Sequence, residues 1–200
     1  MPSPKLGGSR STRIPSFFVV AAFISGGTYA VILNFANIYL ATRANLDVSQ
    51  SNLIVSGFIV CAFIGALATG GWSRFLPTNV LLAVSYLIAS VSIAAFTLLA
   101  ENAFLGMVAL LANGFAISAT YPLTYTELSR HLGSLSQGTG RSFGVLFSGQ
   151  TIGASVLGLV SGYVSQLMGL GVSFGMIAGL TFAGCLTSLV WTRTLRAKVL

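Results

Sequence analysis

Charged residues divide the chain into long apolar segments. No Asp, Glu, Lys or Arg occurs between Arg13 and Arg43, between Asp47 and Arg74, between Arg74 and Glu101, or between Glu101 and Glu127. Each of these segments is a little longer than the roughly 20 helical residues that cross a hydrocarbon core of about 30 Å. A charge at the centre of a membrane helix costs roughly 2.5 to 3.5 kcal/mol. Each charge-free segment therefore predicts one transmembrane helix.

The last charge-free segment, from Arg141 to Arg193, is about twice as long as the others. It is interrupted by a glycine-containing turn at residues 166–171, so it predicts a hairpin of two helices. The predicted helices cover residues 15–41, 51–72, 77–99, 103–125, 142–166 and 172–192. The chain is thus expected to be an all-α integral membrane protein with six transmembrane helices, a basic arm at 1–13, a bundle at 14–192 and a basic tail at 193–200.

The composition excludes a soluble domain. Hydrophobic residues make up 54% of the chain and charged residues 6%, whereas soluble domains carry about 25% charged residues. Both cysteines, Cys61 and Cys185, lie inside apolar segments and are interpreted as packing residues rather than as a disulfide framework. The first apolar segment is about twice the usual length of a signal peptide and lacks an Ala-x-Ala site, so we expect it to remain as a helix.

The basic residues predict the orientation, because cytoplasmic segments retain Lys and Arg. An even number of spans places both termini on one side. That side receives nine of the ten bases, namely Lys5, Arg10, Arg13, Arg74, Arg130, Arg141, Arg193, Arg196 and Lys198. We therefore expect both termini in the cytoplasm and the protein in a bacterial inner membrane or a plasma membrane. Topology and attraction to the lipid bilayer explain the net charge of +7, so no nucleic-acid partner is expected.

Uncharged polar side chains within the helices provide candidate substrate-binding residues. A buried amide needs hydrogen-bond partners or a water-filled cavity. The candidates are Asn34, Asn37, Asn113, Tyr121 and Gln150. They favour a cavity lined by the first, fourth and fifth helices, with the third and sixth helices facing lipid. The alternative is that these side chains only join helices to one another.

The sequence shows no catalytic constellation, cofactor motif or metal site, so we do not expect an enzyme. His131 is the only histidine, and no base lies beside a nucleophile within the predicted helices. Candidate gating residues on the cytoplasmic side are Arg74, Glu127, Arg130 and Arg141. Glu127 also ends a helix that we place beside the cavity, so it is a candidate proton-binding group. Leu128, Leu132 and Leu135 suit a short amphipathic helix lying on the membrane surface.

Small residues recur at every fourth position in three predicted helices. The sets are Gly57, Cys61, Gly65 and Thr69; Gly149 and Gly153, with Gly158 and Gly162; and Gly175, Gly179 and Ala183. Such rows allow the backbones of membrane helices to approach closely. The sequence leaves open whether these contacts are static or allow the helices to rock.

The order of these features, over residues 14–192, resembles one half of a major facilitator superfamily transporter. Gly65 to Arg74 is similar to the family's signature after its second helix, although Thr69 stands where the family has an acid. Leu110 and Leu159 replace residues typical of the N-terminal half. The run from Gly114 to Pro122, then Glu127 and Arg141 to Gly144, looks like the tenth and eleventh helices of a full transporter. The resemblance therefore favours a C-terminal-type half.

The resemblance implies a major-facilitator-type half bundle of two inverted three-helix repeats, paired with a second six-helix bundle around a substrate cavity. That partner is a separate N-terminal-type half or a second copy of the chain. The expected function is alternating-access transport of a small organic solute by a secondary carrier, with export favoured over import. The alternatives are a non-transporting membrane interaction or assembly protein, a remnant half-transporter and, with less support, a channel.

Overall fold

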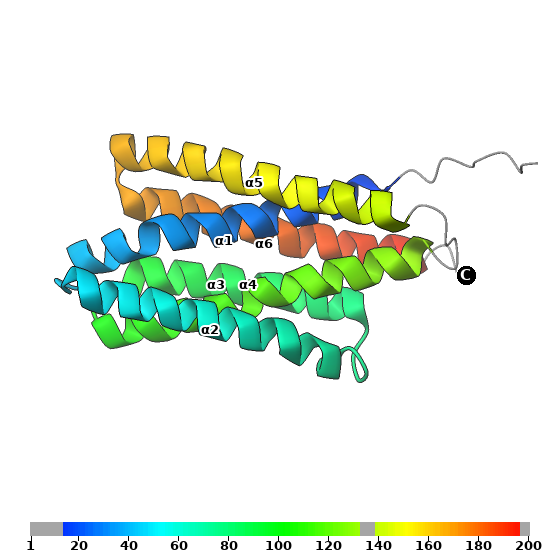
Figure 1. Cartoon of the computed structure of the whole chain (residues 1–200), viewed down its shortest axis with the longest axis horizontal. Coiled ribbons are helices and arrows are strands. Elements are labelled where there is room, and N and C mark those ends of the chain that lie inside the picture. The colour runs from blue at the N-terminus through cyan, green and yellow to red at the C-terminus, as the bar shows by residue number, and fades with distance from the viewer. Residues whose placement is uncertain (1–13, 133–138, 197–200) are drawn as a thin grey trace, which may run out of the picture.

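The structure is a computed structural model that describes residues 14–132 and 139–196. These residues form six helices and no strand (Figure 1). The helices are α1 (Ser16–Arg43), α2 (Val48–Trp72), α3 (Thr78–Leu99), α4 (Ala103–Leu132), α5 (Thr139–Met168) and α6 (Leu170–Arg196). All six are long and apolar enough to cross a membrane. The prediction of a six-helix, multi-pass membrane protein is confirmed.

Turn residues set several helix boundaries. Pro15 and Pro77 immediately precede α1 and α3. Asp47 precedes α2, and its carboxylate accepts a hydrogen bond from the backbone N–H of Gln50 at 2.8 Å, which satisfies an otherwise free donor. Only Gly169 separates α5 from α6, with a φ of +89° that suits glycine. The hairpin predicted at residues 166–171 is therefore a turn around one glycine.

Helix α4 is longer than predicted. It continues to Leu132, whereas the prediction ended it near residue 125. Pro122 lies inside the helix without ending it. Leu128 and Leu132 are buried against Phe18 of α1 and its neighbours. The separate amphipathic helix on the membrane surface is therefore a wrong prediction for residues up to 132, and Leu135 lies outside the described residues.

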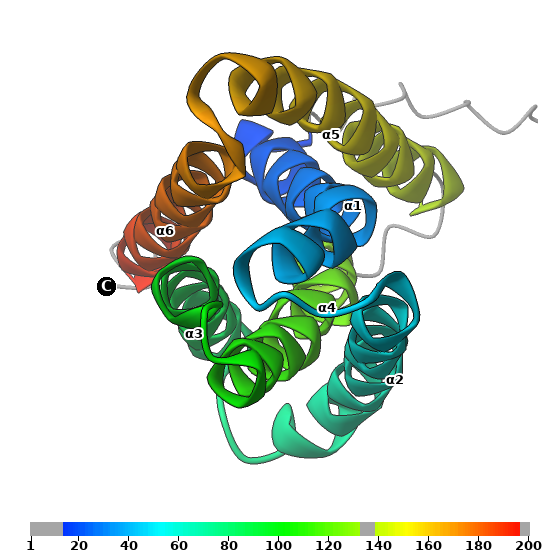
Figure 2. The ribbon, with the colours of Figure 1, turned by 90° about the vertical axis from the view of Figure 1, so that its left-hand side faces the viewer.

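Seen from one end, α1 and α4 occupy the middle of the bundle, and α2 and α5 lie on the outside (Figure 2). Helix α1 packs along α5, α2 along α4, and α3 against both α4 and α6. About 22% of the spans of α2 and α5 is buried, compared with 50% of α3 and 39% of α6. The two most exposed helices of the single chain are thus α2 and α5.

Charged residues are distributed unequally between the two ends of the bundle. Helix α1 begins and α6 ends at the same end (Figure 1), which we call the basic end. Successive helices run in opposite directions, so the order of the helices assigns each charged residue to one end. The described charged side chains near the basic end are Arg74, Glu127, Arg130, Arg141 and Arg193. The opposite end holds Arg43, Asp47 and Glu101.

Glycines allow direct backbone contact at two helix crossings. Between α1 and α5, a Cβ on Gly153 would lie 2.1 Å from the carbonyl oxygen of Phe23. Between α2 and α4, a Cβ on Gly65 would lie 2.0 Å from the carbonyl oxygen of Phe115. Both distances are shorter than van der Waals contact, so only glycine fits. The rows of small residues on α2 and α5 therefore include true contact positions.

Other glycines of the predicted rows make no such contact. A Cβ added to Gly158, Gly175 or Gly179 would meet nothing within 4 Å. Gly175 and Gly179 belong to the row on α6 and lie on its exposed side. The row on α6 is therefore not a packing surface within the bundle.

A network of hydroxyl groups joins three helices in the core. The Tyr86 hydroxyl of α3 donates to the carbonyl oxygen of Ala21 at 2.7 Å and lies 2.7 Å from the Ser25 hydroxyl of α1. The Thr120 hydroxyl of α4 donates to the Ser25 hydroxyl at 2.8 Å. All of these side chains are buried. Because the surroundings are apolar, these bonds fix the rotation of α1 against α3 and α4.

Removing the Tyr86 hydroxyl is expected to destabilise the bundle modestly. We predict that Tyr86→Phe lowers the free energy of unfolding by about 1 kcal/mol, a typical contribution of a hydrogen bond between membrane helices. Tyr163→Phe is the matched control, because the Tyr163 side chain is 65% exposed. Thermal unfolding in detergent measures both variants. Equal melting temperatures would show that the Tyr86 hydroxyl contributes no stability.

Many Ser and Thr hydroxyls outside this network are satisfied inside their own helix. Each donates to the backbone carbonyl three or four residues earlier, the usual arrangement for hydroxyl side chains in helices. The residues are Thr42, Ser56, Thr69, Thr97, Thr124, Thr151, Ser155, Ser165, Thr181, Thr187, Ser188 and Thr192. These hydroxyl groups therefore need no hydrogen-bond acceptor on a neighbouring helix.

Candidate functional site

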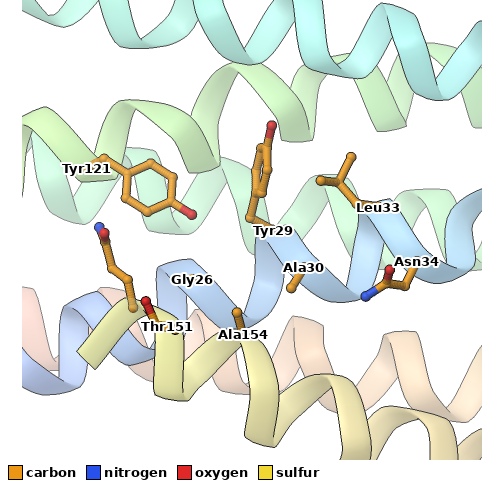
Figure 3. A pocket seen from close by; sticks show the side chains of 9 residues that line it. Gly26, Tyr29, Ala30, Leu33, Asn34, Tyr121, Thr151 and Ala154 are labelled. Carbon is orange, nitrogen blue, oxygen red and sulfur yellow. The ribbon is translucent and has the colours of Figure 1, made fainter. Parts of the chain in front are cut away.

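A cavity of about 370 Å³ lies between α1, α4 and α5. Its lining residues are Gly26, Tyr29, Ala30, Leu33 and Asn34 of α1, Tyr121 of α4, and Gln150, Thr151 and Ala154 of α5 (Figure 3). The α1 residues follow one face of the helix at spacings of three and four. Figure 3 shows Tyr29 and Tyr121 on one side of the cavity and Asn34 toward one end of it.

The lining combines apolar surface, aromatic rings and uncharged polar groups. The rings of Tyr29 and Tyr121 meet edge to face with centroids 6.2 Å apart. The Tyr121 hydroxyl donates to the carbonyl oxygen of Ser25 at 3.2 Å. Among the described residues, the side-chain amides of Asn34 and Gln150 have no hydrogen-bond partner, so both can donate to and accept from a bound molecule.

Three of the five candidate binding residues share this cavity, namely Asn34, Tyr121 and Gln150. Asn37 does not line it. The Asn37 side chain lies one turn further along α1 and donates to the side-chain oxygen of Asn52 in α2 at 3.1 Å. It therefore joins α1 to α2 at the end of the bundle opposite the basic end.

Asn113 also lies outside the cavity. Its side chain is completely buried, and its amide donates to the carbonyl oxygen of Ala89 in α3 at 2.9 Å. The sequence did not reveal that α4 turns this residue toward α3. In this case the alternative interpretation, a side chain that joins two helices, describes the structure.

No protein-family model matches the chain, and no curated protein is significantly similar to it in sequence. The interpretation of the cavity therefore depends on its own residues.

The four candidate gating residues lie near the basic end but do not form one cluster. Arg74 and Arg141 are exposed. Arg130 donates a hydrogen bond to the Thr78 hydroxyl at the start of α3. Glu127 is only 9% exposed, and its carboxylate interacts with the Trp191 side chain of α6. Among the described side chains none of the four forms an ion pair, so any gating role rests on contacts between helices.

The surroundings of His131 are aromatic. Its ring lies 5.4 Å from that of Trp191 and 6.0 Å from that of Phe18, measured between centroids. Within residues 14–132 and 139–196, no three His, Cys, Asp or Glu side chains are grouped as metal ligands would be.

Near the opposite end, Arg43 and Glu101 form an ion pair at 3.4 Å with both side chains mostly exposed, which contributes little stability.

Sequence reasoning missed six of the nine lining residues, including Tyr29 and Thr151. Tyr29 is an aromatic residue within an apolar helix, where packing is the usual role. A usable signal was the helical period: starting from Asn34, the same face of α1 carries Ala30 and Gly26. No comparable signal selects Thr151, because its hydroxyl bonds within α5 like many others.

Proposed function

We propose that this chain forms one half of a secondary transporter that moves a small, uncharged organic solute by alternating access. The observation that carries this proposal is the cavity of α1, α4 and α5. Its lining has no charged side chain and presents two unpaired amides beside two tyrosine rings. A neutral molecule with hydrogen-bonding groups and an apolar face suits this lining.

The packing of the helices supports a major-facilitator-type half bundle. In such a repeat α1, α2 and α3 correspond to α4, α5 and α6, in that order. The α1–α5 contact then corresponds to the α4–α2 contact, and the α3–α6 pair corresponds to itself. Both crossings place a glycine against a backbone carbonyl. An inverted repeat of three helices would produce such equivalent contacts.

The open side of the cavity supports a partner bundle. The Asn34 amide is exposed in the single chain and has no partner among the described residues, and an unsatisfied polar group in hydrocarbon costs several kcal/mol. A second six-helix bundle over this face would enclose the cavity, and that bundle is an N-terminal-type half or a second copy of this chain. In the proposed orientation both termini, and hence the basic end, lie in the cytoplasm, which agrees with the position of the described bases.

The test uses membrane vesicles from cells that produce the full chain and from cells that lack it. A panel of radiolabelled neutral solutes is offered under an imposed proton gradient and without one. We expect uptake or efflux of at least one solute that depends on the chain. Normal membrane insertion, with no chain-dependent movement or binding of any solute, would instead support a non-transporting interaction protein.

Two neighbouring asparagines of α1 provide a matched pair for this assay. Asn34→Leu should reduce transport about tenfold, because one amide hydrogen bond of about 1 to 1.5 kcal/mol is lost from the cavity. Asn37→Leu should leave transport within about twofold of the unmodified chain, since Asn37 contacts Asn52 instead. Equal losses in the two variants would contradict the position of the site.

A further inference from the structure

A second hollow lies on the outer surface between α1 and α6 at the basic end. This groove has a volume of about 610 Å³. Its lining residues are Ser16, Phe17, Val20, Leu186, Thr187, Val190 and Trp191. Three apolar side chains on its walls remain open to the surroundings, because Val190 is 60%, Leu186 49% and Val20 42% exposed. The α1–α6 groove is therefore apolar and open on its outer side.

The groove is too short for a partner helix and suits a flexible chain. On α6 it extends from Leu186 to Trp191, which at about 1.5 Å per residue is roughly one and a half helical turns. The stacked rings of Phe17 and Trp191, with centroids 5.1 Å apart, belong to its lining. Tryptophan is typical of the level where the acyl chains of a bilayer meet the headgroups.

A positive charge lies next to the groove. Leu186, Val190 and Arg193 occur at spacings of four and three and so share one face of α6. Arg193 is exposed. No acidic residue lines the groove, and Glu127, the one described acid near this end, is buried. An anionic group above the groove would meet Arg193, and the described residues place no exposed carboxylate at this end.

We propose that the α1–α6 groove binds an anionic phospholipid, with one acyl chain against Val20, Leu186 and Val190 and the phosphate at Arg193. The charge of Arg193 selects the headgroup, and the apolar walls hold the chain. This proposal does not depend on the proposed transport activity. It uses a different face of the bundle, because none of the groove residues lines the cavity of α1, α4 and α5.

The experiment uses the full chain, purified together with any partner that remains bound. The protein is mixed with phosphatidylglycerol carrying a photoreactive diazirine on one acyl chain, in the presence of excess phosphatidylcholine. After illumination, mass spectrometry of peptides maps the adducts. We expect adducts on residues 16–20 and 186–191, displaced by unlabelled phosphatidylglycerol and not by inorganic phosphate or phosphatidylcholine.

Two pairs of variants test the two parts of the proposal. Val190→Trp fills the groove, whereas Leu189→Trp changes a neighbouring residue that is 46% exposed and does not line the groove. Arg193→Gln removes the headgroup contact, whereas Arg74→Gln removes another exposed base near the same end. We expect Arg193→Gln to lower the adduct yield about fivefold, the ratio expected for one base at a membrane surface. Val190→Trp should also lower the yield, because the indole ring occupies the space of the acyl chain. The two controls should stay within about twofold.

Three outcomes would overturn the proposal. The first is equal labelling in phosphatidylglycerol and phosphatidylcholine. The second is an equal yield from Arg193→Gln and Arg74→Gln, or from Val190→Trp and Leu189→Trp. The third is an absence of adducts at the groove, as expected if a protein partner or a second copy covers this face. Because Arg193 is exposed, Arg193→Gln is expected to fold, and the comparison holds even where Val190→Trp folds poorly.

Discussion

Gly153→Ala is expected to destabilise the bundle by about 3 kcal/mol, at the upper end of the cost of overpacking. The added Cβ would lie 2.1 Å from the carbonyl oxygen of Phe23, which is a backbone atom and moves only if α1 moves away from α5. Gly65→Ala should have a similar effect at the α2–α4 crossing, where the closest atom is the carbonyl oxygen of Phe115 at 2.0 Å. Unfolding of the purified protein in mixed detergent, followed by circular dichroism, measures both losses.

Matched controls exist on the same helices and surfaces. Gly158→Ala lies one and a half turns further along α5 and Gly175→Ala lies on α6, and in both the new Cβ meets nothing within 4 Å. These variants should be neutral or more stable by about 0.5 to 1 kcal/mol, because alanine favours the helix more than glycine does. Gly153→Ala and Gly158→Ala with equal stability would show that α1 and α5 do not approach as closely as described.

Ala154→Trp is expected to abolish transport. Ala154 faces the cavity from α5 (Figure 3), and an indole ring at this position would occupy much of the roughly 370 Å³ between the tyrosines and Asn34. Solute movement in membrane vesicles should then fall to the level of vesicles that lack the chain. A bound solute needs shape as well as hydrogen bonds, so filling the cavity should have a larger effect than removing one amide.

The control for this variant is Val156→Trp. Val156 also lies on α5, is 41% exposed and does not line the cavity. It should retain transport while adding the same side chain to the same helix. Both variants should reach the membrane in equal amounts, as measured by immunoblotting. Full transport by Ala154→Trp would place the substrate path elsewhere in the protein.

The sequence predicted the helices well because charges are excluded from the membrane core. The charge-free segments located all six helices, and five of them within about four residues at each end. The prediction failed at the end of α4, where the charge of Glu127 predicted the end of the helix. In the structure this carboxylate is buried and interacts with Trp191, which lies more than 60 residues later in the chain. A partner so distant in sequence leaves no local pattern.

The candidate site was predicted in part for a related reason. An amide in an apolar helix is conspicuous, so Asn34, Gln150 and Asn113 were selected together. Which of them faces a cavity depends on how each helix is rotated against its neighbours. Asn113 turns toward the carbonyl of Ala89 in α3, and apolar sequences with nearly uniform faces give little information about that rotation. The glycine rows were ambiguous in the same way. Gly153 contacts the backbone of another helix and Gly158 does not, and this difference cannot be read from the row itself.

The hydroxyl groups that bond within their own helix bear on how the chain enters the membrane during synthesis. A helix that reaches lipid before its neighbours must satisfy its polar groups alone. Ser25 and Thr181 can do so, since each donates to a carbonyl of its own helix. The Asn113 amide has no such partner within α4 and finds its acceptor, Ala89, on α3. Because α3 is synthesised immediately before α4, the acceptor is already in the bilayer when the helix that needs it arrives.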